Sequence, residues 1–351
     1  MKNKLTSILI AAVIFAGCHK SNDDTPDAFP ATEQTVLNDF TDDVAIAQYS
    51  DLKNAANDLN AKIAVLNSGA TDANLAAAQV SWKSLRNVWE QCEGFLFGPV
   101  EDNEYDPQMD TWPTDANQFD SLLNSSNALE VADIKLLPYN LRGFHPVEYL
   151  IFGEDGNRTA ASLTDRQKKY MVSATADVVE ICSALYSSWT DGSSAFGQQV
   201  KTAGSGSTVY STKQEVFLAI VGAMQGICEE VGEGKMKEPF DAKDPTIVES
   251  PYSGNSTTDF KNNIIGLRTV YLGNGTAGIT SLVNLRDKSL DNDIKAQISA
   301  AINAFDLITV PYEEAIISQR SQVQQVMNAI DALSETLGER LIPFIQQQVK
   351  D

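Results

Sequence analysis

The segment RGFHPVEYLIFG, residues 142–153, carries the residues best suited to metal chemistry in this chain. His145 is one of only two histidines in the 351 residues, and Glu148 follows it three positions later. Pro146 is typical of the first turn of a helix, so His145 is expected at or near the helix start with Glu148 one turn in. This spacing forms a compact pair of nitrogen and oxygen ligands for a metal ion. A histidine hydrogen-bonded at a helix start, beside a capping carboxylate, is the structural alternative.

The histidine count restricts the kind of metal site. No His-Glu-x-x-His motif is present, and Tyr149 stands where the inverted His-x-x-Glu-His motif needs its second histidine. The other histidine, His19, lies in an expected tether, so one chain cannot form a zinc protease site with two histidine ligands. A Ser-His-Asp triad is not formally excluded, although no Gly-x-Ser-x-Gly elbow accompanies it. A metal would be held mainly by oxygen atoms, which suits iron or calcium better than zinc.

Further carboxylates are expected on a helix that spans residues 71–95. Glu90 and Glu93 follow Arg86 by four and seven positions, which places the three side chains on one helical face. A solvated, salt-bridged stripe and a buried acidic face that points at His145 both fit this pattern. Asp110, in the loop sequence MDTWP, is a further candidate ligand.

The N-terminus resembles a lipoprotein signal. Residues 1–17 hold two lysines and then an apolar run that is too short to cross a bilayer as a helix, and the run ends in Phe-Ala-Gly before Cys18. We expect Cys18 to carry the lipid and residues 18–32 to form a polar tether. The protein is then expected to be anchored to the lipid of the outer membrane, on its periplasmic or its exposed face.

The composition restricts the partners of the protein. The formal net charge is −21, which argues against nucleic acid as a partner, because binding to phosphates needs basic patches. The same charge suits an extracytoplasmic protein or one that handles cations. Cys92, Cys182 and Cys228 lie in apolar helical patterns and are expected as buried thiols, with a Cys182–Cys228 disulfide as the alternative.

Helical periodicity dominates the rest of the chain and predicts an all-α fold. Long helices are expected over residues 33–67, 71–95, 164–190, 212–233, 256–272, 277–289, 291–308 and 312–337. Loop-like sequence that is aperiodic or rich in Gly, Ser or Pro occupies residues 99–116, 191–211 and 234–255. Thr164 is a plausible helix cap, and Ser256 with Asp259 resembles a capping box. We expect two helical-bundle domains of the up-down four-helix style, residues 33–195 and 205–351, packed against each other.

Several segments together resemble the imelysin family. GFHPVEYLIFG is similar to its Gly-x-His-x-x-Glu motif, and three other passages match in order and spacing. These are WKSLRNVWEQCEGFLFGPV, the DTWP loop at residues 110–113, and SPYSGNSTTDFKNNIIGLRTVYLG at residues 250–273. The resemblance covers most of the chain after the tether. Pro146 departs from it, because small or apolar residues are usual at that position of the motif.

The resemblance implies two helical bundles with the motif at their interface, in an extracytoplasmic protein that is often a lipoprotein. Family members are described both as metallopeptidases and as components of iron uptake. A peptidase needs a metal-bound water, an open coordination position and a general base, whereas a single histidine in an acidic protein fits iron capture better. We therefore expect iron or a small iron-containing ligand to bind, and an outer-membrane uptake receptor as a partner. A metallopeptidase, and a module that binds haem or a protein without catalysis, are the alternatives.

The resemblance also assigns roles to individual residues. His145 and Glu148 are expected as metal ligands through the motif, and Glu90 and Glu93 through the matched helix. Arg86 is expected to orient or neutralise a carboxylate. Asp110 and Tyr149 are supporting residues, and Tyr149 is expected mainly in the core with its phenol as a reserve ligand.

Overall fold

The computed structural model describes residues 27–350, so the expected signal segment, Cys18 and most of the tether lie outside the described residues. The first group of helices comprises α1 (Phe29–Asp39), α2 (Ala47–Ser68), α3 (Asp72–Cys92), α4 (Pro99–Asp102), α5 (Tyr105–Asp110), α6 (Ala116–Leu123), α7 (Val131–Ile134), α8 (Phe144–Phe152), α9 (Asp165–Thr190) and α10 (Phe196–Lys201). The second comprises α11 (Lys213–Glu229), α12 (Lys237–Ala242), α13 (Ser256–Leu272), α14 (Ile279–Arg286), α15 (Lys288–Ala304), α16 (Tyr312–Ser318), α17 (Arg320–Thr336) and α18 (Ile342–Gln348). Residues 27–350 contain no strand, which confirms the all-α prediction.

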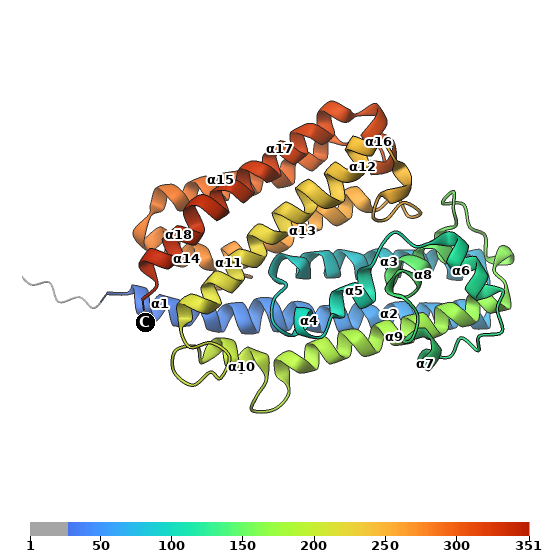
Figure 1. The fold of residues 1–351 in the computed structure, drawn as a ribbon, viewed down its shortest axis with the longest axis horizontal. Coiled ribbons are helices and arrows are strands. Elements are labelled where there is room, and N and C mark those ends of the chain that lie inside the picture. The colour runs from blue at the N-terminus through green and yellow to red at the C-terminus, as the bar shows by residue number, and fades with distance from the viewer. Residues whose placement is uncertain (1–26, 351) are drawn as a thin grey trace, which may run out of the picture.

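Three π-helical segments join neighbouring helices without a turn. Phe40–Ile46 joins α1 to α2, Glu230–Met236 joins α11 to α12, and Leu337–Leu341 joins α17 to α18. The first of these makes one continuous rod from α1 to the end of α2 (Figure 1), as the apolar pattern over residues 33–67 indicated. The rod begins at Phe29, however, four residues before the expected helix start at residue 33, with Pro30 in its first turn.

The two groups of helices lie against each other along their length (Figure 1). In the second group, α11, α13, α15 and α17 pack in a ring, each on two neighbours, as in a four-helix bundle. In the first group, α2 packs on both α3 and α9. The short α8 also packs on both α3 and α9. A short helix therefore stands where a fourth long helix would complete the bundle.

Helix α13 lies directly on α3 and on the 3₁₀ turn Glu93–Phe95 that follows it. A Cβ on Gly266 would lie 2.1 Å from the carbonyl oxygen of Gln91, and one on Gly94 would lie 2.5 Å from the backbone nitrogen of Leu267. Only glycine permits this approach, so the backbones of the two groups meet where α3 ends. The exit of α3 is thereby fixed to the second group.

Several local expectations are confirmed and others are wrong. Thr164 caps α9 in a capping box with Gln167, because each side chain accepts from the other's backbone N–H. No box forms at α13, because the Ser256 hydroxyl accepts from the backbone N–H of Ser250 instead. The loop-like residues 99–116 and 191–211 contain the short helices α4, α5 and α10, and residues 234–255 contain α12. Since α10 packs on α1 and α9, the first group extends beyond residue 195.

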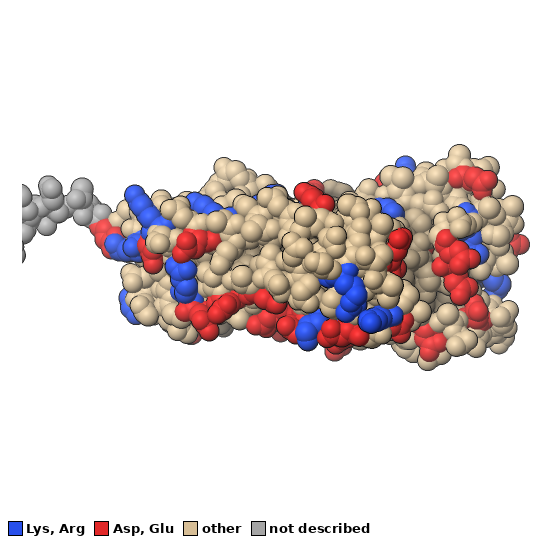
Figure 2. Space-filling view, turned by 90° about the horizontal axis from the view of Figure 1, so that it is seen from above, with Lys and Arg blue, Asp and Glu red and all other residues tan. Residues whose placement is uncertain are grey.

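The three described cysteines are free and buried, so the expectation of buried thiols is confirmed and no Cys182–Cys228 bridge forms. No helix within residues 27–350 has the length and apolar character needed to cross a bilayer. Figure 2 shows one face of the molecule, on which acidic side chains gather along an edge and basic side chains stay scattered. That face therefore offers no extended basic patch for a polyanion.

Candidate metal site

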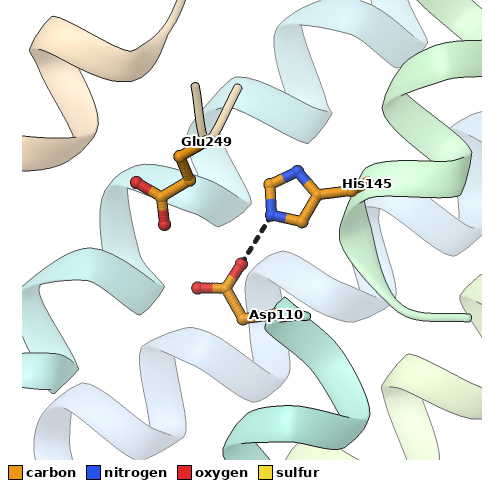
Figure 3. A group of neighbouring side chains, drawn as sticks. All are labelled: Asp110, His145 and Glu249. Atoms are coloured by element: carbon orange, nitrogen blue, oxygen red, sulfur yellow. Dashed lines mark hydrogen bonds and ion pairs between the residues drawn. The ribbon is translucent and has the colours of Figure 1, made fainter. Parts of the chain in front are cut away.

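Four chain segments bring ionisable side chains together where the two groups of helices meet. Helix α3 and the 3₁₀ turn that follows it contribute Arg86, Glu90 and Glu93, the end of α5 contributes Asp110, and the start of α8 contributes His145. The segment before α13 contributes Glu249. In Figure 3 the side chains of Asp110, His145 and Glu249 point toward one another from three separate segments. All of these side chains are buried.

Gly143 fixes the place where α8 begins. Its φ is +83°, and a Cβ there would lie 2.2 Å from the carbonyl oxygen of Met109, so the start of α8 sits directly on the end of α5. Helix α8 begins at Phe144, which makes His145 its second residue and places Pro146 in the first turn. This local geometry holds His145 beside Asp110.

Both ring nitrogens of His145 face carboxylates. The distance from Nε2 to Asp110 Oδ1 is 2.9 Å, and that from Nδ1 to Glu148 Oε2 is 3.2 Å. Burial lowers the pKa of His145, but the hydrogen bonds to Asp110 and Glu148 outweigh it and raise the pKa to about 9. The imidazole is therefore protonated at neutral pH. The second oxygen of Glu148, Oε1, accepts from the backbone N–H of Ser253 at 2.8 Å, which ties α8 to the second group.

Arg86 is the buried cation that α3 contributes to the site. Its guanidinium forms ion pairs with Asp110, with Glu90 and, at 3.0 Å, with Glu249. Asp110 also accepts from Trp89 Nε1 at 2.7 Å. Burial acts to raise the pKa of Asp110, but Arg86 and His145 hold it well below its usual range. The Arg86, Glu90 and Glu93 face is thus buried rather than solvated.

Lys235, in the π-helical segment after α11, supplies a second buried cation. Its Nζ lies 2.8 Å from Glu93 Oε2, 3.0 Å from Glu249 Oε1 and 3.5 Å from Glu90 Oε2. Asn263 of α13 donates from Nδ2 to Glu90 Oε2 at 2.7 Å and to Glu93 Oε2 at 2.5 Å. The second group of helices therefore supplies both a charge and an amide to Glu90 and Glu93 at the end of α3.

The sequence interpretation did not assign Lys235, Glu249, Asp259 or Asn263 to the site, and gave Asp259 only a place in an expected capping box. Asp259 lies 4.0 Å from Arg86 Nε and accepts from Asn255 Nδ2 at 2.6 Å. Asp259 and Asn263 stand four positions apart inside the segment that resembles the family, and this spacing was the available signal. Glu249 and Lys235 fall in the stretch read as a loop, where no periodicity marks a face.

Nine buried side chains thus form one charged cluster. Its members are Arg86, Glu90, Glu93, Asp110, His145, Glu148, Lys235, Glu249 and Asp259. The six acids outnumber Arg86, Lys235 and His145. Burial, together with the charge of Glu90, raises the pKa of Glu249 to about 8, and burial raises that of Asp259 to about 7. Burial and Glu90 also raise the pKa of Glu93 well above its usual range. The cluster therefore favours additional positive charge.

Three sets of potential ligands can be drawn from the charged cluster. Within each set the ligand atoms lie within 4.8 Å of one another. The sets are Asp110, His145 and Glu249; Glu90, Glu249 and Asp259; and Glu90, Glu93 and Asp110. Glu249 Oε2 is buried and accepts no hydrogen bond from any residue that the structure describes. One imidazole nitrogen among carboxylate oxygens is a donor set that suits a hard metal ion such as iron.

Two residues expected at the site have other positions or contacts. Glu148 belongs to none of the three sets, and its oxygens bond to His145 and to the backbone N–H of Ser253. Tyr149 is half-buried and packs edge-on against Phe119 and Tyr252.

Comparison with known proteins agrees with this architecture. The family model of imelysin matches residues 45–340. Iron-regulated protein A of Synechococcus elongatus is 29% identical over 324 residues, which are 90% of this chain and 87% of the relative. The chain belongs to the imelysin family.

Two solved structures share the fold. A protein from Parabacteroides distasonis, described as a candidate iron-regulated protein A precursor, superposes with a TM-score of 0.82 at 22% identity, covering 94% of this chain and 97% of the other. An imelysin-like protein from Psychrobacter arcticum gives a TM-score of 0.76 at 14% identity, covering 93% and 99%. At these identities the two structures establish the fold alone.

Proposed function

We propose that the charged cluster binds a metal ion, with iron as the first candidate, and that the protein serves iron acquisition. One observation carries the proposal: Asp110, His145 and Glu249 converge from three segments with ligand atoms within 4.8 Å of one another. Glu249 Oε2 also lacks a hydrogen-bond partner among the described residues. A buried carboxylate oxygen without a partner is costly, and a bound cation would satisfy it. The relatives from Synechococcus elongatus and Parabacteroides distasonis are named as iron-regulated proteins, which favours iron over zinc or calcium.

Each residue has a defined task in this proposal. Asp110, Glu249 and His145 Nε2 would hold the ion, with Glu90 as the adjoining carboxylate. Glu148 would act on His145 rather than on the ion, because a carboxylate on Nδ1 fixes the orientation of the ring and leaves Nε2 for the metal. His145 would release its proton as the ion binds. Lys235 supplies positive charge to Glu90, Glu93 and Glu249, and a bound ion would take over part of this charge compensation.

The burial of the site favours binding over proteolysis. The exposed fractions of Asp110, His145 and Glu249 are 2%, 1% and 1%. A peptidase must bring a polypeptide backbone beside its metal and keep a coordination position open. The buried ligand atoms offer a place for an ion and no surface for a peptide chain, so we propose capture of iron without peptide hydrolysis.

A metal titration tests the proposal. Purified protein is titrated with ferrous iron under anaerobic conditions, and with ferric iron, zinc and calcium, and bound metal is measured after dialysis. We expect the unaltered protein to bind iron, and the His145→Ala and Asp110→Asn variants to lose that binding. Asp291→Asn is the matched control, because Asp291 is a buried carboxylate held by Tyr271 and Lys295 outside the charged cluster. Equal binding by the unaltered protein and the His145→Ala variant would refute the site.

We also propose that Cys18, which lies outside the described residues, anchors the protein to the outer membrane, where an uptake receptor would be its partner. The signal-like sequence of residues 1–17 supports this. Labelling cells with a clickable fatty acid tests it. We expect the label on the unaltered protein and none on the Cys18→Ser variant. Label on both would show that this cysteine is not the lipidated residue.

A further inference from the structure

A cavity of about 590 Å³ opens beside the charged cluster, between the α4–α5 region and α11. Acidic side chains dominate its polar lining. They are Glu93, Glu101, Glu104, Asp106 and Glu230. No lysine or arginine is among the described residues that line it. Glu101 and Asp106 form no hydrogen bond or ion pair through their side chains with residues 27–350. Burial raises the pKa of Asp106 to about 7, so a cation in the cavity would compete with a proton for this carboxylate.

Glu93 connects this cavity to the charged cluster. It lines the cavity, and its Oε2 lies 2.8 Å from Lys235 Nζ inside the cluster. A carboxylate oxygen of Glu93 also lies within 4.8 Å of ligand atoms of Glu90 and Asp110. A cation at the inner end of the cavity would therefore contact Glu93, which itself adjoins the buried ligands Glu90 and Asp110.

The opposite wall of the cavity is a strip of small residues on α11, namely Ala219, Gly222, Ala223 and Gly226. A Cβ on Gly222 or Gly226 would meet no atom within 4 Å. This differs from Gly94 and Gly266, where a Cβ would strike the backbone of the facing segment. Glycine inside a helix lowers helix stability, and neither Gly222 nor Gly226 is required by a close approach. Their effect is to leave the space beside α11 open.

We propose that this cavity is the passage by which a hydrated metal cation reaches the charged cluster, with Glu93 at its inner end. The inference rests on the proposed metal site and adds the route to it. Acidic walls raise the local concentration of cations and their rate of association. The small residues of α11 leave room for an ion that still carries water. The ligands are otherwise buried, so a route of this kind is needed for loading.

Filling the passage tests the inference. The Gly222→Leu/Gly226→Leu double variant adds two side chains to the α11 wall of the cavity, at positions where a Cβ meets no atom within 4 Å. Anaerobic ferrous iron is mixed with the protein in a stopped-flow instrument, and tryptophan fluorescence is followed, because Trp89 bonds to Asp110. We expect slower association and slower dissociation at an unchanged equilibrium affinity. Gly222→Ala/Gly226→Ala and Gly206→Leu, whose site lies outside the cavity, are controls expected to retain the original rates.

Removing charge from the walls gives a second readout. We expect the Glu101→Gln/Asp106→Asn variant to lose on the order of tenfold in association rate at low ionic strength, and less at high ionic strength. Unchanged rates in the double leucine variant would refute the passage while leaving the metal site intact. Absence of ferrous iron binding by the unaltered protein would refute the site and the passage together.

Discussion

Two buried regions that adjoin the end of α3 have opposite chemistry. The aromatic cluster, on the side of α2 and α9, consists of Phe40, Tyr49, Phe95, Phe97, Trp189 and Phe196. The charged cluster lies on the side of α5, α8 and α13. The 3₁₀ turn Glu93–Phe95 gives one residue to each, since Glu93 faces Lys235 and Phe95 lies 5.9 Å from Phe40 between ring centroids. This three-residue turn therefore forms the boundary between the aromatic cluster and the charged cluster.

The chemistry of each cluster indicates whether it mainly stabilises the fold or mainly binds a ligand. Buried aromatic side chains contribute favourable transfer and packing energy with little dependence on pH. Buried ions must repay a large desolvation cost, and apolar residues of similar volume often stabilise a protein as well or better. The six acids of the charged cluster exceed its internal bases. We therefore expect the aromatic cluster to carry stability and the charged cluster to carry cation binding.

The largest expected effect comes from removing a central residue of either cluster. Arg86→Met leaves Asp110, Glu90 and Glu249 without their shared guanidinium, and we expect a loss of about 3–5 kcal/mol in unfolding free energy at pH 7. Trp189→Ala in the aromatic cluster should cost a similar ~3–5 kcal/mol through lost packing. Urea-induced unfolding followed by circular dichroism measures both losses.

Lowering the pH is expected to affect the stability losses of Arg86→Met and Trp189→Ala differently. At pH 5 the released acids of Arg86→Met can take up protons, so its loss should shrink, whereas the loss in Trp189→Ala should stay the same. Equal losses at both pH values in both variants would mean that the charge of the cluster does not control its stability, and the contrast between the two regions would fail.

The next effect is the pH dependence of the metal-free protein. Folding raises the pKa of Asp259 to about 7, of Glu249 to about 8 and of His145 to about 9. Each group binds its proton more tightly in the folded state, so its contribution to stability is complete at low pH and is lost as pH rises through the folded pKa. Arg86 and Lys235, which face these groups, stay charged because their pKa values are raised. Asp110 titrates far below this range.

We therefore expect the unfolding free energy to fall by several kcal/mol between pH 6 and pH 9, because each pKa unit in each of the three groups is worth about 1.4 kcal/mol. Urea unfolding at a series of pH values measures the slope. Glu249→Gln removes one titrating group and should flatten it. A slope that is unchanged in this variant would show that the pH dependence arises elsewhere.

The fold was predictable from the sequence where helices are long. The apolar repeat predicted α3, α9 and α13 within a few residues, because an amphipathic stripe of five turns leaves a strong pattern. Helices α4 and α5 were read as loop, because four and six residues show no period and such short helices depend on packing. Asp110 ends α5, so the position of one candidate ligand depended on a helix that the pattern did not show.

The candidate site was predictable only on the first group of helices. His145 and Glu148, or Arg86 and Glu90, are one turn apart, so local spacing placed each pair on one face. Glu249 and Lys235 join Arg86 and Glu90 from more than 140 positions away, and periodicity carries no information on such contacts. The relation of Glu148 to Ser253 likewise exists only once the two groups meet.

A smaller effect is expected from Glu148, and it separates a ligand from a positioning residue. Glu148→Gln keeps the size of the side chain but removes the charge that orients His145 Nδ1. We expect iron affinity to fall about 10- to 100-fold, which corresponds to about 1.4–2.7 kcal/mol. Calorimetric titration measures it beside His145→Ala. A complete loss of binding, equal to that of His145→Ala, would instead make Glu148 a ligand.

The smallest effect concerns the glycines that leave the cavity open. Gly222→Ala adds a methyl group into open space within α11, so the variant should gain about 0.5–1 kcal/mol in unfolding free energy, because alanine loses less backbone entropy on folding. Gly266→Ala should do the opposite, since its methyl group would meet the Gln91 carbonyl. Urea unfolding of the two variants side by side measures both signs. A loss of stability in Gly222→Ala would mean that this glycine is needed for packing. The cavity wall would then have a structural role, as the aromatic cluster does, and would not be kept open for a cation.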